Sequence, residues 1–173
     1  MDKVAIFGNA GAGKSTLARR LSELTGLPLY SIDIMQFPDG RSLPHDQYLK
    51  EHAEVLGQEK WIIDGYGCSI SIWERLAAAD TLIYIDLPLI NHYLWVTKRL
   101  VKGMFITPEG WPPNSPIWRS SMAGYRVISL CHRNLTPRYR QYVSEVKTSK
   151  EIHHLTSPRQ IRAFLKQVSS NQG

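Results

Sequence analysis

The sequence has few cysteines and no long apolar run. Its 173 residues include two cysteines, Cys68 and Cys131, too few for a disulfide scaffold and without the spacing of a zinc site. We therefore expect two reduced thiols that pack as small apolar side chains in a cytoplasmic protein. The apolar stretch at residues 81–90 is interrupted by Asp86 and Pro88, so we expect neither a membrane span nor membrane binding. The apolar run at residues 3–7 is too short for a signal peptide.

Acidic residues are missing from one long segment. Residues 110–144 contain no Asp or Glu, and the whole chain has a net charge of +6. Four arginines of this segment recur every seven residues, close to two helical turns, which places the first three on one helix face: Arg119, Arg126, Arg133 and Arg140. Without acids in the helix to pair with them, they are either a clamp for phosphates or a solvated basic face. Arg99 is a further candidate for phosphate binding.

Glycines are concentrated where they suggest chemistry. Residues 8–16 match the phosphate-loop pattern G-x-x-x-x-G-K-[ST], between an apolar run at 3–7 and leucines spaced for a helix. Glycines let backbone N–H groups surround a phosphate tail, and the helix N-terminus adds partial positive charge. In this pattern Lys14 reaches the β- and γ-phosphates and the Ser15 hydroxyl binds Mg²⁺. The expected nucleotide-binding residues are Gly8, Asn9, Ala10, Gly11, Ala12, Gly13, Lys14, Ser15 and Thr16.

The remaining chain alternates strands with helices. We expect strands at residues 3–7, 27–33, 61–64, 81–86 and 151–155, with helices at 15–24, 45–57, 69–79, 90–101, 117–135, 136–146 and 158–168. Thr136 is expected to cap its helix, with Pro137 in the first helical position. This order predicts a single α/β domain over residues 1–173, with a parallel sheet covered on both faces. Residues 102–116 are too irregular for a helix or a strand and are expected to form a functional or mobile loop.

Aspartates follow three of the expected strands. Ligands of parallel sheets bind at the carboxyl ends of the strands, so Asp33, Asp64 and Asp86 belong on one rim with the phosphate loop. Asp64 is favoured for Mg²⁺ because Gly65-Tyr66-Gly67 allows a ligand to approach closely, with Asp86 as the alternative. Asp33 is expected to align an acceptor hydroxyl or act as its base, unless it only forms a turn.

Several motifs together resemble a known group. They are residues 8–16, Ser31-Ile-Asp33, Trp61-Ile-Ile-Asp-Gly65, Glu74-Arg-Leu followed by Asp80-Thr and Leu-Ile-Tyr-Ile-Asp-Leu-Pro88, and Tyr125-Arg126. Over nearly the whole chain they resemble the adenylate-kinase-like proteins called DNA topology modulation proteins. The resemblance implies a three-layer P-loop fold of the nucleoside and nucleotide kinases with a five-stranded parallel sheet. It also implies an acceptor-binding segment at about residues 36–57 and a lid at about 102–116.

The resemblance adds roles for individual residues. Asp33 resembles the acceptor-contacting Asp of small-molecule kinases, and Asp64-Gly65 resembles the Asp-Gly of adenylate kinases. The Pro-Arg that follows in adenylate kinases is Tyr66-Gly67 here, and the acceptor segment offers one arginine, Arg41. We place Asp33, Arg41, Asp64 and Tyr66 at the acceptor.

These patterns predict an ATP- and Mg²⁺-dependent kinase of a small molecule, with a nucleoside or nucleotide as the expected acceptor. Lys14 would neutralise the transferred phosphoryl group, Ser15 and Asp64 would serve the metal, and Arg126 and Arg133 would clamp phosphates. The alternative is a regulatory ATP-binding protein that acts on DNA or a protein partner, with the arginine-rich helix on DNA phosphates. A GTPase switch is less favoured, because the sequence lacks the Asn-Lys-x-Asp guanine motif.

Overall fold

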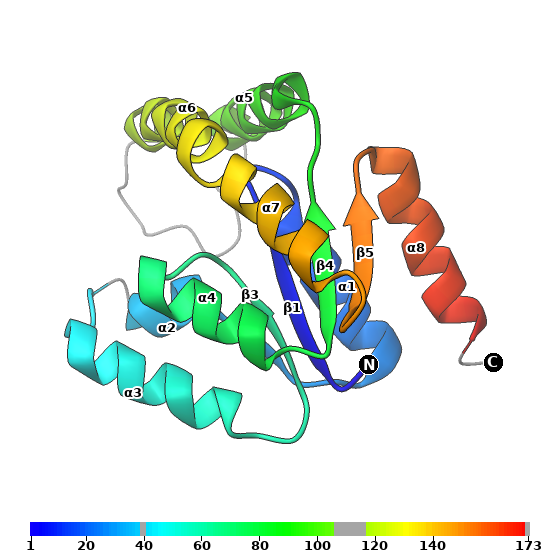
Figure 1. Cartoon of the computed structure of the whole chain (residues 1–173). Coiled ribbons are helices and arrows are strands. Elements are labelled where there is room, and N and C mark those ends of the chain that lie inside the picture. Colours follow the sequence, from blue (N-terminus) through cyan, green and yellow to red (C-terminus); the bar gives the residue numbers. More distant parts are fainter. Residues whose placement is uncertain (39–40, 106–116, 172–173) are drawn as a thin grey trace.

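Five short parallel strands form the central sheet of the protein (Figure 1). The structure is a computed structural model that describes residues 1–38, 41–105 and 117–171, without the side chains of residue 99 and residues 102–123. The strand order is β2-β3-β1-β4-β5. Their bounds are β1 Lys3–Gly8, β2 Leu29–Ser31, β3 Trp61–Asp64, β4 Thr81–Ile85 and β5 Glu151–Leu155. The α/β class and the five-stranded parallel sheet expected from the sequence are confirmed.

Alternate residues of the strands build two separate cores. Ala5 and Phe7 of β1 belong to one buried cluster, and Val4 and Ile6 belong to the other, because successive strand side chains point to opposite faces. β3 and β4 follow the same alternation. Both faces are therefore covered, which explains why these strands read as continuous apolar runs.

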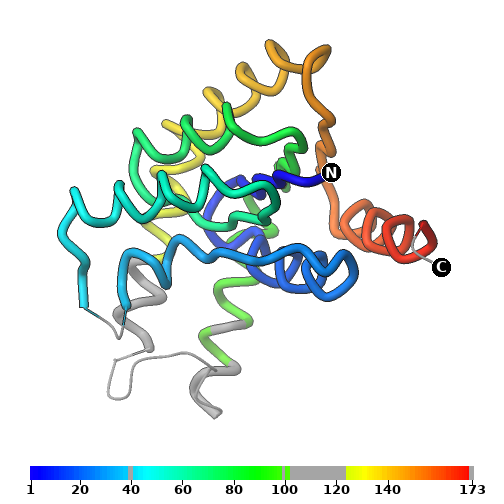
Figure 2. The backbone as a smooth tube through the Cα atoms, turned by 90° about the horizontal axis from the view of Figure 1, so that it is seen from below, coloured from blue at the N-terminus to red at the C-terminus, as the bar shows by residue number. Residues whose placement is uncertain are grey.

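Helices form the outer layers. On one face lie α1 (Lys14–Thr25) and α8 (Pro158–Ser170), and on the other lie α3 (His45–Leu56), α4 (Ser69–Ala78) and α7 (Thr136–Val146). Figure 2, which looks from below, shows these two groups on opposite sides of the strands. The remaining pair, α5 (Leu89–Phe105) and α6 (Ile117–Asn134), pack side by side beyond the carboxyl ends of β1 and β4 (Figure 1). They enclose the phosphate loop from above.

Some element boundaries differ from those expected. The second strand ends at Ser31, and a short helix α2 (Ile32–Gln36) follows where strand was expected to Asp33. Pairing with β3 stops at Ser31 opposite Asp64, because Gly65 turns away with a φ of 114°. Thr136 begins α7 as a helical residue, and its N-cap is Leu135 with no side-chain hydrogen bond. Among the parts of the chain that the structure describes, no helix combines the length and the apolar character needed to cross a membrane.

The irregular segment expected at residues 102–116 is also shorter than predicted. Helix α5 continues to Phe105, so the first residues of the expected lid are helical. The rest of the expected lid, residues 106–116, lies outside the described part of the chain. The expected acceptor segment contains the end of α2 and the whole of α3. An irregular sequence at 102–105 therefore did not prevent helix formation, because α5 packs against α6.

Candidate active site

The phosphate loop joins β1 to α1 in a conformation that needs glycine. Gly8 has a φ of 143° and Gly13 a φ of 77°, values that residues with a side chain rarely adopt. A Cβ on Gly8 would clash with the Ile85 carbonyl of β4, and a Cβ on Gly13 would lie 3.0 Å from the Trp95 ring. Gly13 is also the N-cap of α1, which has no side-chain cap. The first N–H groups of α1 therefore have no capping side chain and remain able to bind an anion.

Three polar side chains brace this loop. Asn9 is buried, donates from Nδ2 to the Ile128 carbonyl of α6 at 3.1 Å, and accepts from the Ala10 N–H at 2.7 Å. His92 of α5 lies 2.9 Å from the Ala10 carbonyl. Lys14 Nζ donates to the Asn9 carbonyl at 3.0 Å. The loop is thus fastened to both helices above it, which fixes the direction of its peptide groups.

A cavity of about 620 Å³ opens in front of the loop. Its floor and walls combine the expected nucleotide-binding residues with expected acceptor residues. From the sequence-predicted set it is lined by Gly8, Ala10, Gly11, Ala12, Gly13, Lys14, Ser15, Thr16, Asp33, Asp64 and Tyr66. Asn9, expected to bind nucleotide, does not line this cavity; its buried side chain braces the loop instead. The fold therefore brings together, in one space, groups that were separate motifs in the sequence.

Two carboxylates line this cavity together with the phosphate loop. Asp64, the last residue of β3, is 2% exposed, and its buried Oδ1 has no hydrogen-bond partner among the residues that the structure describes. Asp33 lies in the first turn of α2, and not at the end of a strand as the sequence suggested. Burial and the neighbouring Asp64 raise the pKa of Asp33, against the opposing charges of Lys14 and Arg75. A carboxyl with a raised pKa in a cleft is suited to accepting a proton from a hydroxyl.

A buried arginine holds the turn that presents Asp64. Arg75 of α4 is 0% exposed and donates from Nη2 to the Gly65 carbonyl at 2.6 Å and to the Tyr66 carbonyl at 3.4 Å. Its Nε and Nη1 have no partner among the described residues, and burial lowers its pKa. No role was predicted for Arg75 from the sequence. Its position in the sequence, three residues after Ile72 and one before Leu76, indicates that it lies on the buried face of α4.

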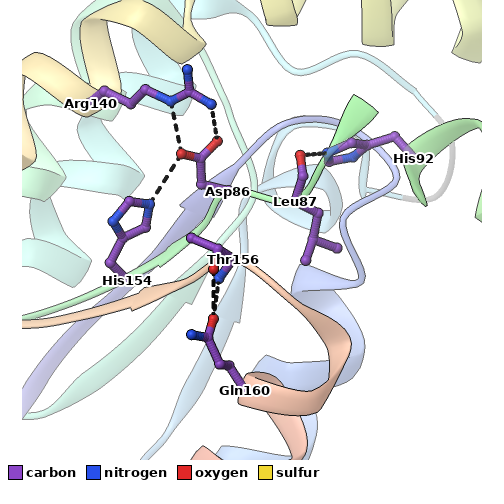
Figure 3. A network of polar contacts seen from close by, with 7 residues as sticks. All are labelled: Asp86, Leu87, His92, Arg140, His154, Thr156 and Gln160. Carbon is purple, nitrogen blue, oxygen red and sulfur yellow. Dashed lines mark hydrogen bonds and ion pairs between the residues drawn. The ribbon is translucent and has the colours of Figure 1, made fainter. Parts of the chain in front are cut away.

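Asp86, the alternative metal residue, is already paired. Arg140 of α7 donates to it from Nε at 2.8 Å and from Nη2 at 3.0 Å, and His154 Nε2 lies 3.1 Å from Oδ2 (Figure 3). Burial would raise the pKa of Asp86, but the hydrogen bonds from Arg140 and His154 outweigh it and hold the pKa below the usual range. These contacts leave Asp64 as the strand-terminal carboxylate with a free buried oxygen.

The arginine series does not act as one unit. Arg140 is paired with Asp86, so the expectation of four unpaired guanidinium groups is wrong for this member. Its partner Asp86 directly follows β4 and lies outside the acid-free segment. Arg126 and Arg133 are exposed and are not among the cavity-lining residues, and the same is true of Arg41. The side chains of Arg99 and Arg119 lie outside the described part of the chain.

Three cavity or loop residues had no assigned ligand role in the sequence. Trp95 packs against Gly13 and lines the cavity, and Cys131 lines it from α6. His92 contacts the loop from behind. Both cysteines are free thiols, and burial raises the pKa of Cys131. From the sequence, Cys131 was expected to pack as a small apolar side chain, and no role was predicted for His92 or Trp95. Helix faces that cover a cavity carry the same apolar pattern as faces that cover a sheet, so the pattern does not distinguish them.

Magnesium is the metal that the motif implies. Ser15 and Asp64 line the same cavity, and the buried Asp64 Oδ1 lacks a protein partner. An oxygen of this kind suits Mg²⁺, which prefers oxygen ligands and keeps several waters alongside one or two protein groups and substrate phosphates. Within the described residues there is no group of three or more His, Cys, Asp or Glu side chains placed to hold a metal ion. The residues present therefore fit a metal held mainly by phosphates and water.

Comparison with known proteins identifies a solved structure with a similar fold. No family model matches the chain, and no curated protein matches its sequence. Among solved structures, it is similar to the shikimate kinase from Acinetobacter baumannii in complex with shikimate, with a TM-score of 0.61 and 16% sequence identity. The match covers 99% of this chain and 95% of that chain. The expected resemblance to DNA topology modulation proteins is not shown by these comparisons. The chain has the α/β fold of the P-loop kinases, with a parallel sheet of five strands.

Proposed function

We propose that this protein transfers the γ-phosphoryl group of ATP to a hydroxyl group of a small molecule. One observation carries the proposal: a single cavity is lined both by the phosphate loop and by Asp33 and Asp64. Phosphoryl transfer requires donor and acceptor to be held in line, with little covalent chemistry from the protein. The fold shared with a shikimate kinase supports the same reaction class.

The phosphate loop would bind the ATP phosphates. The N–H groups at the start of α1 would bind phosphate oxygens, and Lys14 would move its Nζ from the Asn9 carbonyl to the β- and γ-phosphates. Ser15 and Asp64 would hold Mg²⁺, directly or through water. When bound, Mg²⁺ neutralises charge that develops on the phosphate oxygens. Release of ADP then completes the reaction.

The acceptor end favours an uncharged hydroxyl compound. Asp33 would orient the attacking hydroxyl and take its proton. The negative charge of Asp33 repels an anion there, and the guanidinium of Arg75 is buried and donates to backbone carbonyls. Tyr66, Val127 and Leu135 add apolar or aromatic surface. A nucleoside therefore fits better than a nucleoside monophosphate, and the neutral form of a hydroxy acid fits better than its carboxylate.

Acceptor-dependent ADP release tests the proposal. Purified protein with ATP and Mg²⁺ is given matched pairs: nucleosides with their 5′-monophosphates, and shikimate with its methyl ester. We expect one uncharged member to raise ADP release about tenfold or more above the rate with water, since one well-aligned acceptor contributes at least this much. Lys14→Ala is the control for contaminating kinases. ATP binding with no stimulation by any member of the panel would contradict the proposal.

The nucleic-acid alternative lacks a comparable observation. Arg140 is paired with Asp86, which removes one of the four arginines from a phosphate-binding face. DNA binding can be measured at low and at physiological salt, because binding through phosphates depends steeply on salt. No measurable affinity at physiological salt would exclude this alternative.

A further inference from the structure

His92 occupies an unusual position behind the phosphate loop. It lies in the first turn of α5 and is 1% exposed. Its Nδ1 is 2.9 Å from the Ala10 carbonyl of the loop, and its Nε2 is 3.2 Å from the Leu87 carbonyl (Figure 3 draws the second contact). One imidazole ring thus bridges the phosphate loop to the segment between β4 and α5.

Both partners of this ring are hydrogen-bond acceptors. A backbone carbonyl cannot donate, so each contact needs an N–H on the histidine. Neutral imidazole carries one N–H and one lone pair, which leaves one carbonyl facing a lone pair in a buried position. Only the imidazolium form donates to Ala10 and Leu87 at once. The geometry therefore selects the charged form.

The surrounding charges oppose that form until an anion arrives. Burial lowers the pKa of His92, as do the positive charges of Lys14 on α1 and His132 on α6, while the two carbonyl contacts raise it. Asp86, close in sequence, is engaged by Arg140 and His154. No carboxylate among the described residues contacts the His92 ring. Phosphates bound by the loop would supply the missing negative charge, because they would lie on the other side of the same peptide groups.

We propose that His92 is a positioning residue for the phosphate loop, and that it takes up a proton when nucleotide phosphates bind, so that its imidazolium donates to both Ala10 and Leu87. This inference rests on the proposed function in one respect, that the cavity receives nucleotide phosphates. It adds a residue and a proton that the phosphate-loop motif does not contain.

The hydrogen bond to Ala10 has a direct geometric consequence. All peptide bonds described are trans, so the Ala10 carbonyl and the Gly11 N–H point in opposite directions. With the carbonyl fixed on His92, the Gly11 N–H points away from His92, and Gly11 lines the cavity. Losing the contact would free this peptide to rotate, which Gly11 permits because its φ is already 68°. His92 thus controls the orientation of one potential phosphate donor.

Proton uptake on ADP binding tests the proposal in the unmodified protein. Calorimetry of ADP binding is performed at one pH in buffers of different ionisation enthalpy, which reports the protons taken up. Nitrogen-15 NMR of labelled histidine then reports whether both ring nitrogens of His92 carry a proton. We expect net uptake and a doubly protonated ring in the ADP complex. ADP binding with a neutral His92 ring would overturn the inference and leave the kinase proposal intact.

A comparison of His92→Gln with His132→Gln shows whether the proton taken up on ADP binding goes to His92. Glutamine keeps an N–H donor of similar reach but cannot take up the charge. From pH 5.5 to 8.5 we expect ADP affinity of the unmodified protein to weaken about tenfold more than that of His92→Gln, the change that a one-unit pKa displacement produces. ADP also titrates, near pH 6, but this affects its binding to the unmodified protein and to His92→Gln equally, so it cancels in the comparison of the two affinities. His132→Gln should keep the proton uptake.

The remaining outcomes are also decisive. Equal pH dependence in His92→Gln and the unmodified protein would overturn the inference. If His92→Gln does not fold, the calorimetry and NMR of the unmodified protein still decide. If ADP does not bind at all, the proposed function and this inference both fail.

Discussion

Asp64 and Asp86 follow two strands that flank the same central strand, yet they have opposite environments. Asp64 ends β3, lines the cavity, and has a buried oxygen without a partner. Asp86 follows β4 and has both oxygens engaged by Arg140, with His154 as a second partner of Oδ2. In sequence the two look alike, since each comes after an apolar run. The difference leaves one carboxylate oxygen available within the cavity and commits the other carboxylate to contacts within the fold.

The two environments reflect where the partners come from. Arg140 and His154 are 54 and 68 residues away from Asp86 in the chain, and they reach it because α7 and β5 pack beside β4. On the other side of β1, the space beside Asp64 is bounded by the phosphate loop and α2. A carboxylate that meets guanidinium and imidazole groups is satisfied, whereas one that meets a cavity is available to a metal or a substrate.

Removing the positive charge of Lys14 from the cavity should have the largest effect on turnover. We expect Lys14→Ala to lower turnover about 10²- to 10³-fold, as loss of one charge-stabilising donor in an active site does. The fold should remain, because the Lys14 side chain makes one hydrogen bond, to a loop carbonyl. Steady-state ADP release and circular dichroism check both parts. Turnover within tenfold of the unmodified protein would show that Lys14 does not neutralise the transferred group.

Neutralising Asp64 should separate activity from stability. Asp64→Asn is expected to lower turnover about 10²-fold, because the metal and the acceptor lose a charged ligand. The free energy of unfolding should change by less than about 1 kcal/mol, since Oδ1 has no hydrogen bond to lose. Urea unfolding and a Mg²⁺ titration of activity measure the two effects. A stability loss larger than the activity loss would place Asp64 with Asp86 as a structural residue.

Asp86→Asn should show the reverse pattern. We expect turnover within about threefold of the unmodified protein and a loss of about 1 kcal/mol of stability at pH 7, because a two-point contact to a half-exposed arginine is broken. The folded-state pKa of Asp86 is lowered, so its contribution is present above 3.8 and disappears as the pH falls through the folded-state pKa. Urea unfolding at pH 7 and pH 3 measures this. Arg140→Gln, which removes the same contact from the other side, should match it.

Asp33→Asn should give the smallest stability change, with the opposite sign. The folded-state pKa of Asp33 is raised above 3.8, so the ionised form costs stability at neutral pH. Asp33 is exposed to solvent, which screens this effect, so the variant should be more stable at pH 7 by less than about 0.5 kcal/mol, and the gain should vanish below pH 3.8. Urea unfolding across this range tests the sign. An unchanged or lower stability at pH 7 would mean that burial does not disfavour the charge of Asp33.

Local patterns predicted most of the fold. Apolar runs bounded by turn residues located β1, β3 and β4, and leucine spacing located α1. The last helix was predicted to begin at residue 158, and α8 does begin there, with the Ser157 side chain accepting from the Gln160 N–H. The second strand was predicted too long because its end depends on the turn at Gly65 in a neighbouring strand. A boundary set by a neighbour leaves little trace in the local sequence.

The candidate site was predictable to a different degree in its two halves. The phosphate loop is a continuous stretch of sequence, residues 8–16, so the motif alone predicts it. The bracing residues Asn9, Arg75 and His92 act through contacts with distant backbone carbonyls, such as that of Ile128, which no spacing rule reveals. The arginine series looked unpaired because its one described acidic partner lies 54 residues earlier.

By itself, the sequence determined the parallel α/β sheet and the phosphate loop, because strands, helices and glycine turns follow from residues a few positions apart. Only the tertiary structure decided which aspartate faces the cavity and which is paired, where Asp33 lies, and that one histidine meets two carbonyls. Those outcomes depend on charges and hydrogen-bond partners that distant segments bring together. Their cost or benefit arises from burial, which exists only once the chain has folded.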